Sequence, residues 1–227
     1  MSARRPVTFL LLAAAAFLLA SCSAVDVVGR TAITTFQALL DATSGSVALD
    51  GAANRWMLTS KGGERFSWSA DFAGTASDFQ ISFDARPFLD AGLDTSKLPA
   101  ERYSFDAASG TLTLSFEAGG ERFTYAGVAT PLETFRKIVA AYRPIIGYHA
   151  ALDHYGIALG DGNMFEWAKD MAKNDKDIVF VLNPGPLEAA GVDPARITGW
   201  IFAKIPVKDA TGKTVDVDKF VKPYNLK

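Results

Sequence analysis

The chain has very few of the residues on which most enzyme active sites and metal sites depend. Its 227 residues include one cysteine and two histidines, so no internal disulfide and no cysteine-based metal site can form. The Gly-x-Ser-x-Gly, His-Glu-x-x-His, Gly-x-x-x-x-Gly-Lys-Ser/Thr and Rossmann patterns are missing as well. We therefore expect no cofactor, no catalytic set of residues and no enzymatic activity, and a fold that is stabilised by packing alone.

The sequence also lacks an excess of charge of one sign. It has 23 Lys and Arg against 25 Asp and Glu, and the mature chain without Arg4 and Arg5 has 21 against 25. A mildly acidic protein without a basic stripe is a poor candidate for nucleic-acid binding, so we expect no nucleic-acid partner. With 16 Phe, 4 Trp and 6 Tyr, however, the chain has ample material for an ordinary globular core.

The first 22 residues have the parts of an export signal, in the expected order. Arg4-Arg5 is the positive region, and Val7 to Leu19 is an apolar run shorter than the roughly 20 residues of a membrane span. Leu19-Ala20-Ser21-Cys22 then resembles the lipobox of bacterial lipoproteins. The resemblance implies that residues 1–21 are removed and that Cys22 carries a diacylglycerol thioether and usually an N-linked acyl chain such as palmitate. An ordinary signal peptide that leaves Cys22 unmodified is the alternative.

The resemblance also implies a place in the cell. Residue 23 is Ser and not Asp, which in Gram-negative lipoproteins favours the outer membrane; otherwise the outer face of the plasma membrane is expected. Residues 22–30 form a tether of about 30 Å at full extension, so the domain is expected close to the membrane to which its lipid binds.

The mature chain contains an internal repeat with an offset of 99 residues. From 35 to 98, 14 of 64 ungapped pairs with 134 to 197 are identical, against roughly one in fifteen expected from composition. Identical pairs include Thr35-Phe36 with Thr134-Phe135, Phe66 with Phe165, Trp68 with Trp167, and Gly92 with Gly191. We read the chain as two copies of one unit, 31–128 and 129–227.

Each unit is predicted to contain a helix, a hairpin, a strand, a short helix and a further strand, with extra strands in the first. Thr130-Pro131-Leu132-Glu133 is a capping box and predicts a helix start. The segment 145–154 is ambiguous between a helix and an irregular stretch, a strand is expected at 122–125, and 217–227 reads as a tail. The fold class is therefore α+β: two tandem helix-plus-antiparallel-sheet repeats packed as a pseudo-symmetric pair, with the helices on one sheet face.

Two groups of residues are candidates for a site. His149, Asp153 and His154 form a polar cluster with weak potential for metal binding, although structural histidines are far more common. Phe66, Trp68, Phe79, Phe83 and Trp167 lie on alternating strand faces and either pack in the core or line an apolar ligand pocket.

Three functions remain open. The leading hypothesis is a membrane-anchored, non-catalytic module of the cell envelope that binds a protein or surface polymer. The second is a carrier of a hydrophobic ligand such as lipid, and the third is an enzyme that depends on the His149 cluster.

Overall fold

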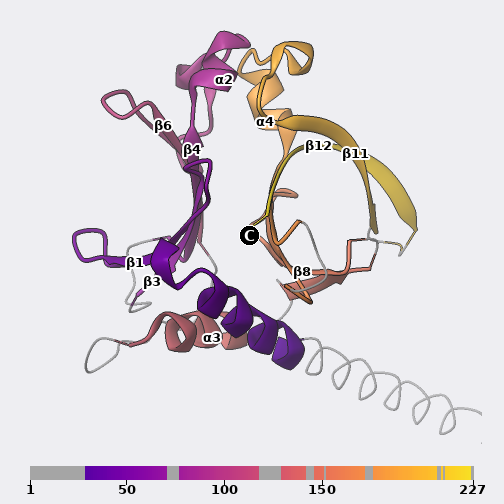
Figure 1. Cartoon of the computed structure of the whole chain (residues 1–227). Helices are drawn as coiled ribbons and strands as arrows, with labels where there is room; N and C mark the ends of the chain where they lie inside the picture. Colours follow the sequence, from indigo (N-terminus) through magenta and orange to yellow (C-terminus); the bar gives the residue numbers. More distant parts are fainter. Residues whose placement is uncertain are drawn as a thin grey trace, which may run out of the picture.

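The computed structural model describes residues 29–70, 77–117, 129–141, 146–150, 152–171, 176–208, 211 and 213–225. The leader, Cys22 and the expected strand at 122–125 lie outside these residues. The described chain is a mixed α+β fold with two similar six-stranded antiparallel sheets that stand next to each other (Figure 1). The expected fold class is confirmed at this level.

The first sheet has the strand order β1-β2-β3-β4-β6-β5. Its strands are β1 Val47–Asp50, β2 Arg55–Thr59, β3 Arg65–Ser69, β4 Phe79–Asp84, β5 Tyr103–Asp106 and β6 Thr111–Phe116. The second sheet has the matching order β7-β8-β9-β10-β12-β11. Its strands are β7 Ile146–His149, β8 His154–Ala158, β9 Met164–Ala168, β10 Ile178–Leu182, β11 Ile201–Lys208 and β12 Thr214–Tyr224.

The helices lie at the two ends of the paired sheets. A helix over 29–42 and α3 (Pro131–Ala141) lie side by side at one end, while α2 (Arg86–Asp90) and α4 (Pro184–Ala189) meet at the other (Figure 1). Short 3-10 turns, η1 (Ser44–Ser46), η2 (Thr95–Lys97) and η4 (Pro194–Arg196), complete the described elements. The predicted start of α3 is confirmed, because the Thr130 N–H donates to Glu133 Oε2 at 2.9 Å and the Glu133 N–H to Thr130 Oγ1 at 3.3 Å.

The 99-residue offset holds for the strands as well as for the sequence. The strands β1 to β4 begin at residues 47, 55, 65 and 79, and β7 to β10 begin at 146, 154, 164 and 178. Among the described residues each half has six strands, so the first half has no more strands there than the second, contrary to our expectation. Residues 146–149 form β7, a strand where we left a helix or an irregular stretch open, and most of the expected tail belongs to β12.

Equivalent residues of the two halves stack on each other at the centre of the molecule. Phe66 of β3 and Phe165 of β9 are parallel with ring centroids 4.1 Å apart, and Phe36 and Phe135 of the two long helices stack at 3.6 Å. All four side chains are fully buried. The two sheets thus share one aromatic core, and each contributes the same positions to it.

The long helices exchange contacts between the halves. Trp68 of the first sheet donates through Nε1 to Pro131 O and Thr134 Oγ1 of α3, at 3.0 and 3.1 Å. Trp167 of the second sheet donates to Thr35 Oγ1 of helix 29–42 at 2.8 Å. Each indole therefore finds its hydrogen-bond acceptor on the helix of the other half, which ties the halves together through buried polar bonds.

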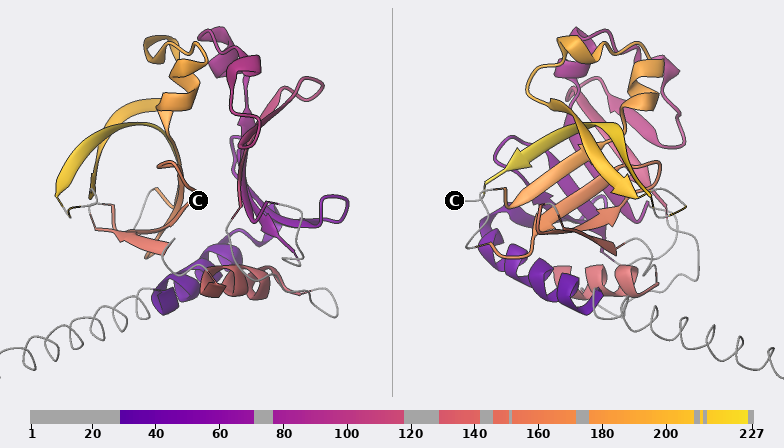
Figure 2. Two further views of the ribbon diagram at one scale, coloured as in Figure 1. Left: turned by 180° about the vertical axis from the view of Figure 1, so that it is seen from behind. Right: turned by 90° about the vertical axis from the view of Figure 1, so that its right-hand side faces the viewer.

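The second sheet is more strongly curved than the first (Figures 1 and 2). Its β11–β12 hairpin pairs eight residues on each strand, from Ile201–Val221 to Lys208–Thr214, whereas β5 and β6 pair over four. Long strands accumulate more twist and coil, which lets this hairpin arch over the sheet. The result is a half-barrel whose concave side faces away from the first sheet.

Candidate ligand pocket

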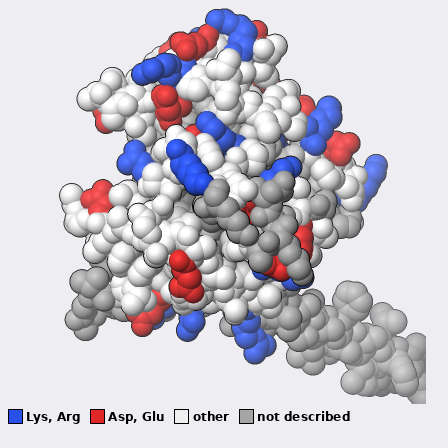
Figure 3. Space-filling view, in the orientation of Figure 1, with Lys and Arg blue, Asp and Glu red and all other residues white. Residues whose placement is uncertain are grey.

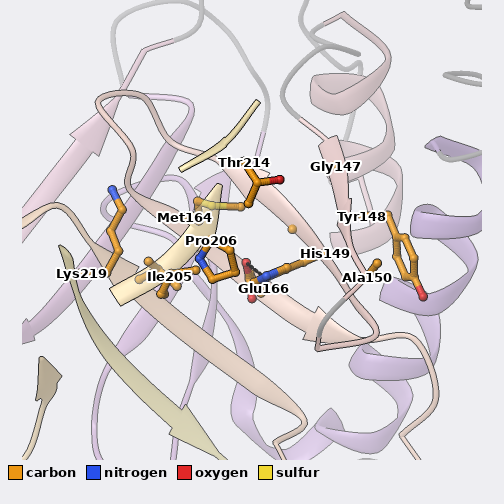
Figure 4. A pocket seen from close by; sticks show the side chains of 12 residues that line it. Gly147, Tyr148, His149, Ala150, Met164, Glu166, Ile205, Pro206, Thr214 and Lys219 are labelled. Atoms are coloured by element: carbon orange, nitrogen blue, oxygen red, sulfur yellow. Dashed lines mark hydrogen bonds and ion pairs between the residues drawn. The ribbon is translucent and has the colours of Figure 1, made fainter. Parts of the chain in front are cut away.

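The concave side of the half-barrel encloses a pocket with a volume of about 420 Å³ (Figure 4). Every strand of the second sheet contributes to its lining, including the two edge strands. The lining residues are Gly147, Tyr148, His149, Ala150, Gly156, Met164, Glu166, Val181, Ile205, Pro206, Thr214 and Lys219. A cavity of this size in the mouth of a small barrel is the usual setting for one small ligand.

The lining is mostly apolar, and β10 shows the difference from the first sheet most clearly, because β10 is buried on both of its faces. All five residues of Ile178–Leu182 are buried, whereas residues 79–83 of β4 in the first sheet alternate between buried and half-buried positions. Val179 and Val181 occupy the places that Gln80 and Ser82 hold in β4, 99 residues earlier. The same sheet face is thus polar in the first half and apolar in the second.

Two glycines keep the pocket open at β7 and β8. Gly147 and Gly156 are cross-strand partners, so their missing side chains lie on the same face of the sheet. A Cβ on Gly156 would lie 3.0 Å from Glu166 Cγ, but a Cβ on Gly147 would meet no atom within 4 Å. A side chain at 147 would therefore grow into the empty space of the pocket.

A buried carboxylate between two imidazoles is the main polar feature of the site. Glu166 is 2 % exposed, and its Oε1 lies 3.3 Å from His149 Nδ1 (Figure 4). Its Oε2 lies 3.6 Å from Nδ1 of His154, beyond hydrogen-bond length, and His154 is fully buried. His154 Nδ1 and Nε2 and Glu166 Oε2 have no hydrogen-bond partner among the described residues.

The ionisation of this group follows from its contacts. The hydrogen bond to Glu166 raises the pKa of His149 against the opposing effect of burial. Burial tends to raise the pKa of Glu166, but the contacts with His149 and His154 outweigh it and hold the pKa below its usual value. The lowered pKa favours the ionised form of the carboxylate, which lies between the two imidazoles.

Lys219 is the other charged residue of the lining. In Figure 4 it lies on the opposite side of the pocket residues from Tyr148. It is 7 % exposed, and burial lowers its pKa. Its Nζ donates to the Gly162 carbonyl at 2.8 Å. Among the residues that the structure describes, no carboxylate forms an ion pair with it.

The structure brings two of the three predicted polar candidates together and separates the third. His149 and His154 are adjacent through Glu166, because β7 and β8 form a hairpin in which they are directly paired. Asp153 lies in the turn, where it accepts from Tyr148 OH and lies 3.7 Å from Lys169 Nζ. Within the described residues, no cluster of three or more His, Cys, Asp or Glu is arranged to hold a metal ion.

The five aromatic candidates all lie in the core that the sheets share. Phe66, Trp68, Phe79 and Trp167 are fully buried, and Phe83 is 1 % exposed. Their rings contact each other and Phe36, Phe135 and Trp200. Their positions match the core-packing interpretation, and the pocket described here is on the opposite face of the second sheet.

The pocket residues Glu166, Lys219 and Val181 were not identified from the sequence. One signal was available: the uninterrupted apolar run Ile178–Leu182 replaces an alternating strand, which indicates burial on both faces. The first sheet covers only one face of this strand. Burial of the other face therefore requires a cavity or a covering element on that side.

A second hollow of about 410 Å³ lies between helix 29–42, the β1–β2 hairpin and the start of α3. Leu40, Val47, Trp56 and Leu132 are among the residues that line it. Trp56 Nε1 is buried and has no hydrogen-bond partner in the described part of the chain. This hollow contains no pair of opposed charges or histidine cluster among its lining residues, so we consider the half-barrel pocket the stronger candidate.

Comparison with known proteins identifies no relative of this chain. No helix among the described segments is both long and apolar enough to cross a membrane. No protein-family model, no curated protein and no solved structure matches the chain.

Proposed function

We propose that this protein is a lipid-anchored, non-catalytic binding module of the cell envelope that holds a small, largely apolar ligand in the half-barrel pocket. The pocket carries the proposal: about 420 Å³ in volume, lined by all six strands and mostly apolar, with a few charged groups. This is the geometry of a ligand carrier, which the sequence left as the second hypothesis. The aromatic residues that we had considered as lining serve the core in this proposal.

The anchor is part of the proposal. The Leu19-Ala20-Ser21-Cys22 sequence supports attachment of diacylglycerol and acyl chains to Cys22, and Ser23 supports the outer membrane in a cell that has one. Two or three acyl chains suffice for stable attachment, because each buried CH₂ contributes about 0.8 kcal/mol. The short segment between Cys22 and helix 29–42 would then keep the pocket near the bilayer.

We further propose that residues 31–128 and 129–227 are copies of one helix-plus-sheet unit packed as a pseudo-symmetric pair. The identical strand orders and the stacking of Phe66 on Phe165 support this arrangement. In it, the two long helices close one end of the aromatic core between the sheets, as the bonds from Trp68 and Trp167 to α3 and helix 29–42 suggest. The half-barrel pocket lies in the second copy, whose outer sheet face is more apolar and whose last hairpin is longer.

A non-catalytic role fits the pairing of the polar groups. A hydrolase needs a nucleophile within hydrogen-bond reach of its base. Across the described residues, no hydroxyl or thiol is hydrogen-bonded to His149 or His154, and His149 is paired with Glu166. The mixed charges on the surface seen in Figure 3 also suit a role without nucleic acid.

The test is to isolate the protein from its own membranes and to measure bound ligand by native mass spectrometry. We expect a ligand mass on the wild-type chain and its loss in Gly147→Leu, whose side chain fills the pocket. Gly51→Leu is the matched control, because a Cβ there also meets no atom within 4 Å. Equal ligand occupancy in all three proteins, or none in the wild type, would contradict the proposal.

One observation favours a protein or surface polymer as a further partner. Ile201 and Phe202 are adjacent on the edge strand β11 and are 54 % and 40 % exposed. An edge strand with exposed apolar residues can accept another strand. A pull-down from detergent-solubilised envelopes should then recover a partner with the wild type and lose it with Phe202→Ser.

A further inference from the structure

We propose that the ligand of the half-barrel pocket is an apolar chain that ends in a single carboxylate, with Lys219 as its counter-ion. The inference rests on the proposed function and specifies its ligand. Three features of the site carry it: the volume of the cavity, a lysine with no carboxylate partner among the described residues, and the contacts of the Glu166 carboxylate with two histidines.

The volume limits the length of the chain. A volume of about 420 Å³ lies toward the lower end of the roughly 300–1,000 Å³ of small-molecule pockets, so it suits one short chain. Met164, Val181, Ile205 and Pro206 supply apolar contacts along the cavity. A saturated carboxylate of about twelve carbons is a suitable probe of this volume and lining.

Lys219 supplies the charge that selects the head group. Its side chain is 7 % exposed, and one of its three N–H groups is taken by the Gly162 carbonyl. The neighbouring acidic residue of β12, Asp218, faces the other side of the strand and lies 3.8 Å from Lys204 Nζ. A buried ammonium without a carboxylate is costly, and a ligand carboxylate would remove that cost.

The cation is particular to the second half. Leu182 pairs with Phe220, and Phe83, 99 residues before Leu182, pairs with Leu112. Lys219 therefore takes the place that Thr111 holds in the first sheet. The half that forms the half-barrel pocket is also the half with a lysine at this position.

The carboxylate of Glu166 does not make the pocket a site for cations. It is held by His149 at 3.3 Å and approached by His154 at 3.6 Å. These contacts occupy the Glu166 carboxylate, whereas Lys219 has no charged partner among the described residues. An anionic head group is the complementary choice.

The experiment compares three ligands that share one chain. Dodecanoate, dodecan-1-ol and dodecylammonium are titrated calorimetrically, below micelle-forming concentrations and at about pH 8, where the carboxylate is ionised. The protein is the mature chain from residue 22 with Cys22→Ser, so that no detergent is required. The variants are Lys219→Met, Lys219→Arg, Gly147→Leu and, as a matched control, Lys204→Met, whose lysine is exposed on the adjacent strand.

We expect dodecanoate to bind at least about tenfold more tightly than dodecan-1-ol, the ratio of one charge-assisted hydrogen bond. Lys219→Met should remove this preference, Lys219→Arg and Lys204→Met should keep it, and Gly147→Leu should abolish binding of all three. Thermal melts of each variant establish that it is folded, and the arginine variant tests the role of charge even if the methionine variant is unstable.

Two outcomes overturn the inference in different ways. If the alcohol or the ammonium binds as tightly as the carboxylate, and Gly147→Leu still abolishes binding, the head group is wrong while the proposed function remains. If dodecanoate does not bind, or binds equally to Gly147→Leu, neither the ligand nor the pocket is as proposed.

Discussion

Gly92 and Gly191 contact each other through their backbones at the end of the molecule where α2 and α4 meet. A Cβ on Gly92 would lie 2.7 Å from the Gly191 carbonyl oxygen, and a Cβ on Gly191 would lie 2.7 Å from the Gly92 oxygen. Hydrogen bonds flank the contact on both sides: Asp94 N–H to Ala190 O at 2.8 Å, and Asp193 N–H to Ala91 O at 2.9 Å. The residues that repeat most clearly in the sequence thus bind their own counterparts.

Alanine at either glycine should destabilise the protein strongly. Both residues have φ in the left-handed region, +108° and +105°, and both would place a methyl group against a backbone oxygen that cannot move aside easily. We expect each of Gly92→Ala and Gly191→Ala to lower the free energy of unfolding by about 3 kcal/mol, the sum of backbone strain and overpacking. Urea denaturation measures this.

The variant Gly63→Ala distinguishes the effect of backbone strain from that of overpacking. Gly63 has φ of +92°, but a Cβ there would meet no atom within 4 Å. It should therefore cost only the backbone strain, about 1 kcal/mol. Equal losses for Gly63, Gly92 and Gly191 would show that the contact between the halves is unimportant.

The two buried tryptophans should respond differently to removal of the threonine they bind. Thr35→Val leaves Trp167 Nε1 without its acceptor, at a cost of about 1–3 kcal/mol for an unsatisfied buried donor. Thr134→Val should cost less, because Trp68 Nε1 keeps the Pro131 carbonyl at 3.0 Å. A larger loss in unfolding free energy for Thr134→Val than for Thr35→Val would contradict this reading of the two bonds.

Glu64 should make the stability of the protein depend on pH. This carboxylate is 2 % exposed and joins the β2–β3 turn to β12, with Lys222 Nζ at 2.7 Å, Ser60 Oγ at 2.7 Å and Tyr224 OH as partners. Burial tends to raise its pKa, but these bonds together lower it below the usual value. Its stabilising effect is therefore complete above the unfolded pKa of about 4.3 and is lost as the pH falls through the lower folded pKa.

The comparison of wild type with Glu64→Gln isolates this effect. At neutral pH the variant should unfold more easily by about 3 kcal/mol, because Lys222 loses its buried partner. Below pH 4 the difference should shrink as Glu64 of the wild type takes up a proton. The exposed Glu101→Gln is the control, and a difference between wild type and Glu64→Gln that is constant with pH would refute the prediction.

Cys22 should determine whether the protein stays with the membrane. In Cys22→Ala the proposed site of acylation is gone, so the protein should move from the membrane fraction to the soluble fraction. Mass spectrometry of the N-terminal peptide should find diacylglycerol and acyl chains on the wild type only. Membrane association that is unchanged in the variant would leave the lipobox resemblance without support.

The repeat made much of the core predictable from the sequence. The 99-residue offset placed Phe66 with Phe165 and Trp68 with Trp167, and the structure brings these residues into one aromatic cluster. It also identified the β8–β9 hairpin, which local periodicity alone would have left ambiguous. Two strands of the second half were not recognised from the sequence. These are β7 and the full length of β12, neither of which shares an identical residue with its counterpart, β1 or β6.

The repeat did not predict the pocket. Glu166 and Lys219 have no acidic or basic counterpart in the first half, where Ser67 and Thr111 stand, so the repeat gave no reason to select them. His149 and His154 were noticed, but a helical spacing would have joined His149 to Asp153. In the β7–β8 hairpin, His149 pairs with His154 and both face Glu166 on the next strand.

The sequence by itself determined the resemblance to a lipoprotein leader, the two-fold repetition and the identity of much of the core, because these depend on residue type and on spacing along the chain. The curvature of the second sheet was decided by tertiary structure, since it arises from the twist that a long hairpin accumulates between distant strands. That curvature brings the edge strands β7 and β11 to opposite sides of one cavity and places a lone lysine at its wall. A local sequence pattern cannot predict this cavity, because its lining joins residues that are up to 72 positions apart, from Gly147 to Lys219.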